Sequence, residues 1–285
     1  MKDPKIFCMC LYDHHLENLK KLNYIPVGLG KNTFSKSWLK DDTEINIAKK
    51  NPFYGEYTFY YWIWKNFLKK IDDNSWIGFT GYRYHWSQDD NIHSDDLNKI
   101  INNNNFEEYI LKEIPPEWNN VDIVLGQKIK INNWKISKIL KHAKKNFFLN
   151  PSNFLKSNQN IKLQFDIFHG DGLLDKAISV LDKSDRNDFK DFVIGENSFN
   201  RENLFFCKSK KIMNDYFSSI FGWLEKCEKI FGFNLQGYSQ KRIYAFLAER
   251  YLSYWFNKYT KPLTWPIFFY DTNKNKIEIK NETSK

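Results

Sequence analysis

A short apolar run, Trp76 to Thr80, leads directly into a turn rich in groups that could bind a ligand. The turn reads Gly81-Tyr82-Arg83-Tyr84-His85-Trp86. An arginine guanidinium presents a planar fork of N–H donors that suits phosphate oxygens and sugar hydroxyls, and the neighbouring rings offer platforms. The structural alternative is a turn whose arginine only stacks on those rings. Because α/β proteins bind ligands beyond the carboxyl ends of their strands, this turn is a candidate ligand site.

A second polar segment, Tyr12-Asp13-His14-His15, follows the apolar run Lys5 to Leu11. A continuous apolar run of this length is typical of a buried parallel strand, so the polar segment lies at the strand's carboxyl end. Histidines on an ordinary surface are the simpler interpretation of this segment. It is nevertheless a second candidate site at a strand end.

The predicted helix Tyr238 to Phe256 carries Arg242, Glu249 and Arg250 within an apolar pattern. Arg242 and Glu249 are seven residues apart, which places them on one face about two turns from each other. A glutamate–arginine pair in such a helix is usually a structural ion pair. A carboxylate that faces a cleft could instead act as a general base or bind a sugar hydroxyl.

The sequence contains no common phosphate-loop, dinucleotide, serine-hydrolase or zinc-protease motif. The acidic pairs Asp89-Asp90 and Asp95-Asp96 are adjacent, so their carboxylates point apart on an extended chain and make a poor metal clamp. We therefore predict no metal ligands. The cysteines show no metal-like spacing and are expected to be free thiols in a reducing compartment: Cys8, Cys10, Cys207 and Cys227.

The elements that must position these residues alternate between apolar runs and helical patterns. Strands are predicted at Lys5 to Leu11, Tyr24 to Leu29, Trp76 to Thr80, Val121 to Leu125 and Asn203 to Lys208. Helices are predicted at Pro52 to Lys70, Leu97 to Leu111, Ile161 to Asp182 with a break near Gly170, Lys210 to Ile230, and Tyr238 to Phe256, and Asp185 to Asp191 is predicted as a polar connection. The pattern predicts an α/β fold: a partly parallel sheet with helices on both faces, followed by a helical part.

The predicted helix from Pro52 is crowded with rings that carry a polar atom: Tyr54, Tyr57, Tyr60, Tyr61, Trp62 and Trp64. Each buried tyrosine or tryptophan needs a partner for its O–H or N–H group. A helix that only fills a core rarely needs so many of them.

The composition limits the classes of partner. The chain has 285 residues, is 42% hydrophobic and 18% aromatic, and carries a net charge of +9. Solvated lysines explain this charge most simply, and attraction to a nucleotide diphosphate, an anionic membrane or nucleic acid is the functional interpretation. A nucleic-acid-binding protein is the alternative from another class. Lysines scatter along the chain instead of forming a stripe, so we predict no nucleic-acid partner.

No apolar stretch approaches the roughly 20 residues of a membrane span, and the N-terminal apolar run is too short for a signal peptide. We therefore expect a cytoplasmic protein, with peripheral contact at the inner face of the cytoplasmic membrane as an option.

An ordered set of motifs resembles a family of bacterial capsule and exopolysaccharide glycosyltransferases, long described as a domain of unknown function. The N-terminal matches are YIPVGLG from Tyr24, Asp42-x-x-x-Asn46-Ile47, NPFYGEYTFYYWIWKN from Asn51 and WIGFTGYRYHW from Trp76. The later matches are Val121-Asp122-Ile123, His169, Asn203-Leu204-Phe205-Phe206 and R-x-x-x-F-L-x-E-R from Arg242 to Arg250. The resemblance runs from about Lys5 to Phe256. It departs from the family pattern at Ala48, Gly81 and Tyr84, where a serine, a histidine and a second arginine are typical.

The resemblance implies one GT-A-like domain over residues 1–270, with a nucleotide-binding half to about 130, a helical acceptor half to 270, and a polar tail over 271–285. It implies transfer of a hexose, of the galactose or galactofuranose type, from a UDP-sugar donor. The acceptor is expected to be a glycan, often lipid-linked, in cell-surface polysaccharide synthesis, and a membrane glycolipid is the alternative. The resemblance does not decide whether Mn²⁺ or Mg²⁺ is a cofactor, because Arg83 stands where many such enzymes carry Asp-x-Asp. We expect cationic side chains to neutralise much of the departing diphosphate.

The resemblance also implies site residues. Donor binding is expected of Leu11, Tyr12, His14, Val27, Gly28, Asp42, Asn46, Tyr54, Glu56, Tyr82, Tyr84, Arg242 and Arg250. Catalytic roles are expected of Arg83, Glu249, His169 and Asp122. Transfer with inversion needs a base, and the sequence does not rank Glu249, Asp122 and Asp171 for that role.

Overall fold

The computed structural model describes residues 4–73, 75–90, 101, 105–131, 152, 155, 158–200 and 202–270. Within these residues, nine strands form one sheet at the centre of the molecule. They are β1 (Lys5–Cys10), β2 (Ile25–Gly28), β3 (Leu39–Lys40), β4 (Ile77–Gly81), β5 (Tyr84–Trp86), β6 (Ile123–Gly126), β9 (Phe205–Cys207), β10 (Leu263–Trp265) and β11 (Ile267–Phe269). A separate antiparallel pair joins β7 (Lys128–Lys130) to β8 (Ser198–Asn200).

The main path of the sheet is mostly parallel. Its order is β10-β6-β9-β4-β1-β2-β3, with β5 beside β4 and β11 beside β5. Strands β1 to β4 run in one direction, and β9 is antiparallel to both β4 and β6, so β6 and β10 run with β4. The carboxyl ends of β1, β2 and β4 and the amino end of β9 therefore meet at one edge.

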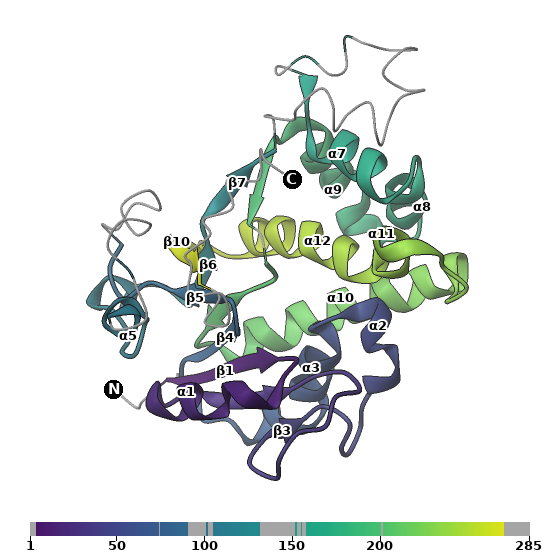
Figure 1. The fold of residues 1–285 in the computed structure, drawn as a ribbon. Coiled ribbons are helices and arrows are strands. Elements are labelled where there is room, and N and C mark those ends of the chain that lie inside the picture. The colour runs from purple at the N-terminus through teal and green to yellow at the C-terminus, as the bar shows by residue number, and fades with distance from the viewer. Residues whose placement is uncertain are drawn as a thin grey trace.

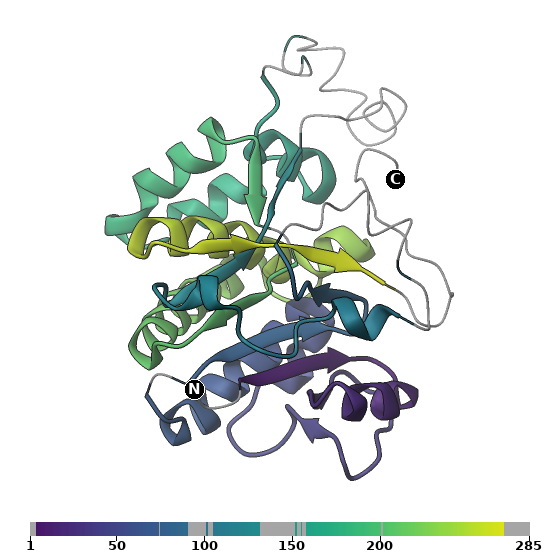
Figure 2. The same cartoon turned by 90° about the vertical axis from the view of Figure 1, so that its left-hand side faces the viewer.

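Helices flank the sheet and fill the C-terminal half. The described helices are α1 (Leu16–Lys21), α2 (Asn51–Tyr54), α3 (Tyr57–Trp62), α5 (Phe106–Tyr109), α7 (Ile161–His169), α8 (Leu173–Ser179), α9 (Lys183–Gly195), α10 (Lys210–Phe231), α11 (Gly237–Lys241) and α12 (Ile243–Tyr259). Figures 1 and 2 show α7, α8 and α9 grouped at the end of the molecule away from β1 and α1. Helices α10 and α12 lie between the two ends (Figure 1).

The aromatic segment after Pro52 is not one helix, as predicted, but a series of short turns. Gly55 adopts a φ of 57°, which no right-handed helix accommodates, so α2 ends before it and α3 begins at Tyr57. A π-helical turn over Ile63–Phe67 and a 3-10 turn over Leu68–Lys70 complete the segment.

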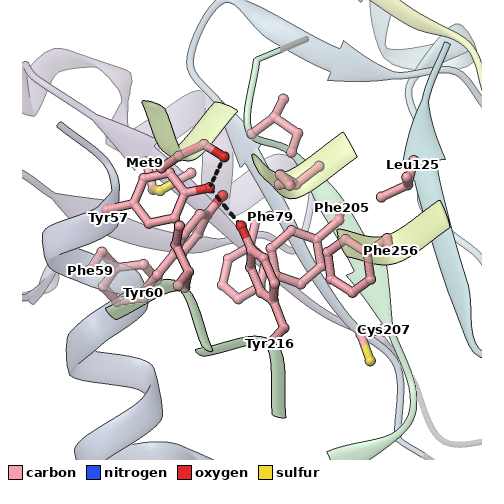
Figure 3. Close-up of a cluster of buried hydrophobic side chains, with 14 of the residues drawn as sticks. Met9, Tyr57, Phe59, Tyr60, Phe79, Leu125, Phe205, Cys207, Tyr216 and Phe256 are labelled. Carbon is pink, nitrogen blue, oxygen red and sulfur yellow. Dashed lines mark hydrogen bonds between the residues drawn. The ribbon is translucent and has the colours of Figure 1, made fainter. Parts of the chain in front are cut away.

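Tyr54, Tyr57, Tyr60 and Trp62 pack into the main core, and their O–H and N–H groups have polar partners, as expected for buried rings of this type (Figure 3 shows Tyr57 and Tyr60). The hydroxyls of Tyr57 and Tyr216 lie 2.7 Å apart, and Tyr60 donates to the carbonyl oxygen of Asn203 at 2.6 Å. The Tyr60 ring also packs at 4.6 Å from Phe79 on β4. The tyrosines thus join the core to the segment that precedes β9.

Several other predictions need correction. The polar segment Asp185 to Asp191 is not a connection but part of α9, which buries Phe189 and Val193 on its apolar face. The helix predicted from Tyr238 divides at Arg242 into α11 and α12. Strands β5, β10 and β11 were not predicted, because runs of three residues carry little periodicity.

Other predicted elements are confirmed, including the break between α7 and α8 at Gly170 and Gly172. The predicted helix Leu97 to Leu111 falls partly outside the described residues, and its described part is helical only over Phe106–Tyr109. Asp95, Asp96 and residues 271–285 lie outside the described residues. No helix in the described part of the chain is long and apolar enough to cross a membrane.

Candidate active site

The carboxyl edge of the sheet opens into a pocket of about 400 Å³. One wall comes from the residues at the ends of β1 and β4, and the facing wall comes from the start of α12. Seven of the residues predicted for the site line this pocket together: Leu11, Glu56, Tyr82, Arg83, Tyr84, Arg242 and Glu249. The tertiary structure therefore joins segments that lie far apart in the sequence.

Two arginines line the pocket, Arg83 after β4 and Arg242 at the start of α12. The Arg83 guanidinium lies 4.9 Å from the centre of the Tyr82 ring and 5.9 Å from that of Phe269. The Arg242 guanidinium lies 5.7 Å from the Tyr238 ring. The buried Nε atoms of both arginines have no hydrogen-bond partner among the described residues. A buried donor without a partner costs about 1–3 kcal/mol. Both guanidinium groups therefore favour binding of a ligand that brings a negatively charged acceptor oxygen into the pocket.

Gly55 makes room for Arg242. A Cβ atom at residue 55 would lie 2.4 Å from the Arg242 Nη2 atom, closer than any two such atoms can approach. The left-handed backbone at Gly55 is also unfavourable for other residues. Both observations explain why a glycine interrupts the aromatic segment at this point.

Two carboxylates, Glu56 and Glu249, complete the pocket. Glu56 accepts a hydrogen bond from the Asn203 side-chain amide at 2.6 Å and lies 3.5 Å from Arg242 Nη2. Glu249 accepts from the backbone N–H of Glu202 at 3.1 Å and pairs with Arg250 at 2.6 Å. Burial raises the pKa of Glu56, although Arg242 and Asn203 oppose the shift.

The segment that holds both carboxylates is strained. Glu202 and Asn203 have φ angles of 74° and 55°, which side-chain-bearing residues rarely adopt and which cost of the order of 1–3 kcal/mol each. Asn203 is fixed from behind by Tyr57, whose hydroxyl lies 3.2 Å from its Oδ1 atom, and by Tyr60. Such strain is typical of functional sites.

An aromatic cluster adjoins the pocket next to Tyr82. Tyr12 and His14 stack with centroids 5.6 Å apart, and the Tyr12 ring meets Tyr82 edge-on at 6.1 Å. Tyr12 is 46% exposed, and His15 links the cluster to Tyr82 at 4.9 Å. Tyr12 and His14 therefore lie beside the pocket without lining it.

Four predicted donor-binding residues lie outside the pocket. Val27 is fully buried, and Gly28 packs so closely under Phe34 that an added Cβ atom would lie 2.7 Å from the ring. Asp42 pairs with Lys40 at 2.8 Å, and the Asn46 side chain bonds to the backbone of its own loop. These contacts stabilise the loops after β2 and β3.

Three further predicted residues do not line the pocket but lie next to residues that do, or pack against them. The Tyr54 hydroxyl donates to Glu228 at 2.6 Å. Arg250 is 2% exposed and also contacts Gln164 at 2.7 Å. His169 is buried and stacks on the pocket residue Phe246 with centroids 4.0 Å apart. Burial lowers the pKa of His169, so this ring is neutral at pH 7.

Asp122 lies at the other edge of the sheet. It precedes β6, which runs parallel to β4, and it lies 3.6 Å from Lys208, which follows β9. The structure therefore does not bring Asp122 to the pocket. Asp171 is exposed in the turn between α7 and α8 and does not line the pocket either.

Comparison with known proteins identifies the family. Residues 5–261 match a family described as a domain of unknown function, DUF4422. The chain belongs to this family. A search of the curated proteins found no match.

Among solved structures, the chain is similar to the apo structure of WbbM, a bifunctional glycosyltransferase, with a TM-score of 0.62 at 21% sequence identity. The match covers 95% of this chain and 46% of that chain, so this chain spans about half the length of WbbM. This likeness concerns the fold, and with the sheet topology it confirms the predicted α/β class, a mostly parallel sheet flanked by helices.

Sequence reasoning missed several pocket residues, above all Glu202 and Asn203. Asn203 belongs to one of the motifs quoted for the family resemblance, but a lone asparagine before a strand gave no sign of a role. Tyr238, which is 71% exposed, and Phe246 also line the pocket from the helical half. Within the described residues, no group of three or more His, Cys, Asp or Glu side chains is arranged to hold a metal ion.

Proposed function

We propose that this chain is a glycosyltransferase that transfers a hexose from a nucleotide sugar to a hydroxyl group of an acceptor glycan. The observation that carries the proposal is that one pocket holds two carboxylates and two arginines whose Nε atoms have no partner in the part of the chain that the structure describes. Such a reaction needs cationic groups for the diphosphate that leaves and, when it proceeds with inversion, a base for the proton of the acceptor, a role that a carboxylate can fill. The fold shared with a glycosyltransferase supports the same class.

The size and position of the pocket suit a nucleotide sugar. Its volume of about 400 Å³ falls within the range of about 300–1,000 Å³ that is typical of small-molecule sites. It lies beyond the carboxyl ends of parallel strands, where α/β folds bind nucleotides. The arginines supply the charge that a diphosphate needs, so the departing group would be neutralised at least partly by side chains.

We further propose a UDP-sugar donor of the galactose or galactofuranose type, as the family resemblance implies. The acceptor would be a growing cell-surface polysaccharide, often lipid-linked, met at the inner face of the cytoplasmic membrane. A membrane glycolipid is the second acceptor class, favoured by the net charge of +9, because anionic lipid surfaces attract basic proteins.

A thermal-shift screen tests the function class. We expect UDP and UDP-hexoses to raise the melting temperature, and we expect UMP to do so less, because it lacks the second phosphate. Single-stranded oligonucleotides at the same phosphate concentration serve as the control for non-specific charge. Stabilisation by the oligonucleotides and not by any nucleotide sugar would contradict the proposal.

The role of the arginines is tested separately by metal removal. With UDP-galactose as the probe, we expect part of the UDP-forming activity to survive EDTA, because Arg83 and Arg242 remain to neutralise the diphosphate. Activity that disappears completely with EDTA and returns with Mn²⁺ or Mg²⁺ would show that a metal ion does this work instead.

A further inference from the structure

The two carboxylates of the pocket differ in how fully their oxygens are bonded. Glu249 Oε1 accepts from the Glu202 backbone N–H at 3.1 Å, and Oε2 accepts from Arg250 Nη1 at 2.6 Å. Arg250 is itself buried and held by Gln164. Both oxygens of Glu249 are therefore occupied by donors from the protein.

Within the described part of the chain, Glu56 accepts a hydrogen bond on one of its two oxygens. Its Oε1 atom accepts from Asn203 Nδ2 at 2.6 Å. Its Oε2 atom lies 3.5 Å from Arg242 Nη2, well beyond the 2.7–2.9 Å of a strong charge-assisted hydrogen bond. Because Glu56 lines the pocket, this second oxygen is available to a hydroxyl group bound there.

We infer that Glu56 is the general base that removes the proton of the acceptor hydroxyl, and that Glu249 is a positioning residue. The inference rests on the proposed glycosyl transfer and deepens it by naming the group that activates the acceptor. Sequence reasoning placed Glu56 among the donor-binding residues and considered Glu249 as a base. The contacts in the pocket reverse these roles.

The surroundings of Glu56 suit a base. Burial raises its pKa, and the anionic Glu249 adds to the shift, while Arg242 lowers the pKa without cancelling the effect. Among the described residues, the hydroxyls of Tyr57, Tyr60 and Tyr216 also interact with Glu56, and burial raises their pKa values strongly, so they stay protonated. A carboxylate with a pKa nearer to neutral pH is a better proton acceptor than an ordinary glutamate.

Asn203 sets the orientation of this base. Its side-chain amide donates to Glu56, and its oxygen atoms accept from Tyr57 and Tyr60. The backbone N–H next to it, that of Glu202, holds Glu249. One strained turn therefore positions both carboxylates, and two tyrosines of α3 hold that turn in place.

The proposed transfer is a single displacement at C1 of the donor sugar. Glu56 Oε2 takes the proton as the acceptor oxygen forms a bond to C1 of the donor sugar. The bond between C1 and the phosphate oxygen breaks, and its electron pair leaves with the nucleoside diphosphate, whose charge Arg83 and Arg242 are placed to meet. The configuration at C1 inverts, and Glu56 returns the proton to water.

The test compares Glu56→Gln with Glu249→Gln, and with Glu228→Gln as the matched control. Glu228 is also a partly buried carboxylate with a tyrosine and a lysine partner, but it lies outside the pocket. The probes are UDP-galactose as donor and a p-nitrophenyl galactoside as acceptor, with UDP release as the measure. We expect Glu56→Gln to lower kcat by about 10²–10⁴-fold, the usual contribution of a general base, while UDP still raises its melting temperature.

Glu249→Gln should lose stability first. We expect the melting temperature of Glu249→Gln to fall well below that of the wild type. The Glu249→Gln protein that remains folded should show the same pH dependence of kcat as the wild type. In the wild type, kcat should rise with pH through the raised pKa of Glu56, and this rise should be absent from Glu56→Gln. Glu56→Asp, which moves the carboxylate but keeps it, should lower kcat and retain the rise.

The outcomes separate the inference from the function on which it rests. If the wild type turns over UDP-galactose and Glu56→Gln keeps kcat within threefold, the inference is wrong and the glycosyltransferase stands. The same conclusion follows if Glu249→Gln, and not Glu56→Gln, abolishes the pH dependence. If no nucleotide sugar binds to the wild type, both the function and the inference are overturned.

Discussion

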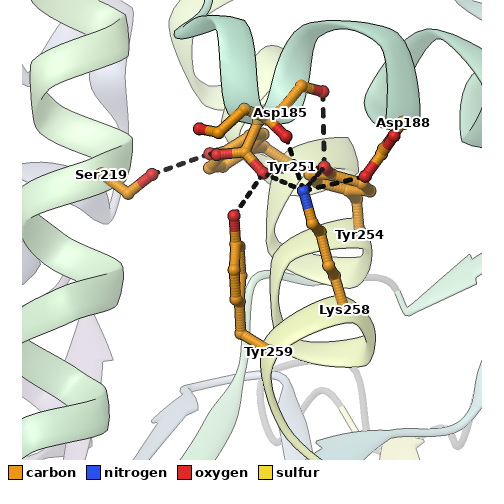
Figure 4. A network of polar contacts seen from close by, with 8 residues as sticks. Asp185, Asp188, Ser219, Tyr251, Tyr254, Lys258 and Tyr259 are labelled. Atoms are coloured by element: carbon orange, nitrogen blue, oxygen red, sulfur yellow. Dashed lines mark hydrogen bonds and ion pairs between the residues drawn. The ribbon is translucent and has the colours of Figure 1, made fainter.

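Asp185 and Glu56 are both acidic side chains that the fold removes from water, yet their partners differ. Asp185 lies in the first turn of α9, and its Oδ1 atom accepts from three residues of α12: Tyr254 at 2.8 Å, Tyr259 at 2.7 Å and Lys258 at 2.8 Å (Figure 4). Glu56 has one hydrogen bond from Asn203 and a more distant arginine.

The consequence is opposite pKa shifts. Burial alone would raise the pKa of Asp185, but the hydrogen bonds from Lys258, Tyr259 and Tyr254 outweigh it and hold the pKa below its usual value. For Glu56, burial prevails and the pKa is raised. The comparison teaches that the number of donors, more than burial itself, decides whether a carboxylate stabilises the fold or stays available for proton transfer.

The largest effect is expected from removing the charge of Asp185. Asp185→Asn replaces the charged acceptor shared by Lys258 and two tyrosine hydroxyls with a neutral amide, which should cost about 3 kcal/mol of unfolding free energy. The matched control is Asp188→Asn, since Asp188 also pairs with Lys258 at 2.9 Å but is 59% exposed. It should cost less than about 1 kcal/mol. Urea unfolding measures both, and equal losses would contradict the assigned role of Asp185.

The next effect concerns the room that Gly55 gives to Arg242. Gly55→Ala should displace the guanidinium and weaken UDP binding by about tenfold, the equivalent of one charge-assisted hydrogen bond. Gly232→Ala is the control, because Gly232 has a similar φ of 59° but open space around it. Both variants should lose stability through backbone strain, and only Gly55→Ala should lose affinity in calorimetric titration. Equal affinities would show that Arg242 does not bind the nucleotide.

The pH dependence of stability should differ in sign between the two carboxylates. The contribution of Asp185 is present above its unfolded pKa of about 3.9 and is lost as the pH falls through its lower folded pKa. The folded state of Glu56 binds its proton more tightly, so the wild type should lose stability relative to Glu56→Gln as the pH rises from about 4.3. Urea unfolding from pH 3 to pH 8 measures both differences. A parallel response of the two variants would contradict the comparison.

The smallest effect on stability is expected at Gly81. This residue lines the pocket, and the family pattern described above typically has a histidine at this position. A Cβ atom there meets nothing within 4 Å among the described residues, and its φ is not left-handed. Gly81→Ala should therefore change the unfolding free energy by less than about 0.5 kcal/mol. Gly81→His should fold equally well but change the preference among UDP-hexoses. Unchanged preference would show that this position does not contact the sugar.

Much of the site's location could be predicted from the sequence. Apolar runs that end in polar segments marked the ends of β1 and β4, and the spacing of Arg242 and Glu249 put both on one face. Leu11, Arg83 and Glu56 were expected in the site and line the pocket. The position of these residues could be predicted because strand ends and helical spacing are local properties of the chain, and their roles stay predictions.

The role of Asn203 could not be predicted in the same way. Its importance arises because β9 is antiparallel to its neighbours, which carries its leading residues to the edge where parallel strands end. The same topology places Asp122 at the opposite edge. Strand direction in a sheet depends on pairing between distant segments, so the local pattern around either residue could not reveal it.

The sequence by itself determined the alternation of strands and helices, the large number of tyrosines in the segment after Pro52 and the turn with Arg83 at the end of β4. Only the tertiary structure decided what those groups do. Among the described residues, Glu249 has hydrogen-bond donors on both oxygens, whereas Glu56 has a donor on one oxygen and Arg242 at 3.5 Å from the other. Tyr57 and Tyr60 hold the strained turn at Asn203. The physical reason is that proton affinity depends on burial and on the donors within hydrogen-bond distance, and packing between distant segments fixes both.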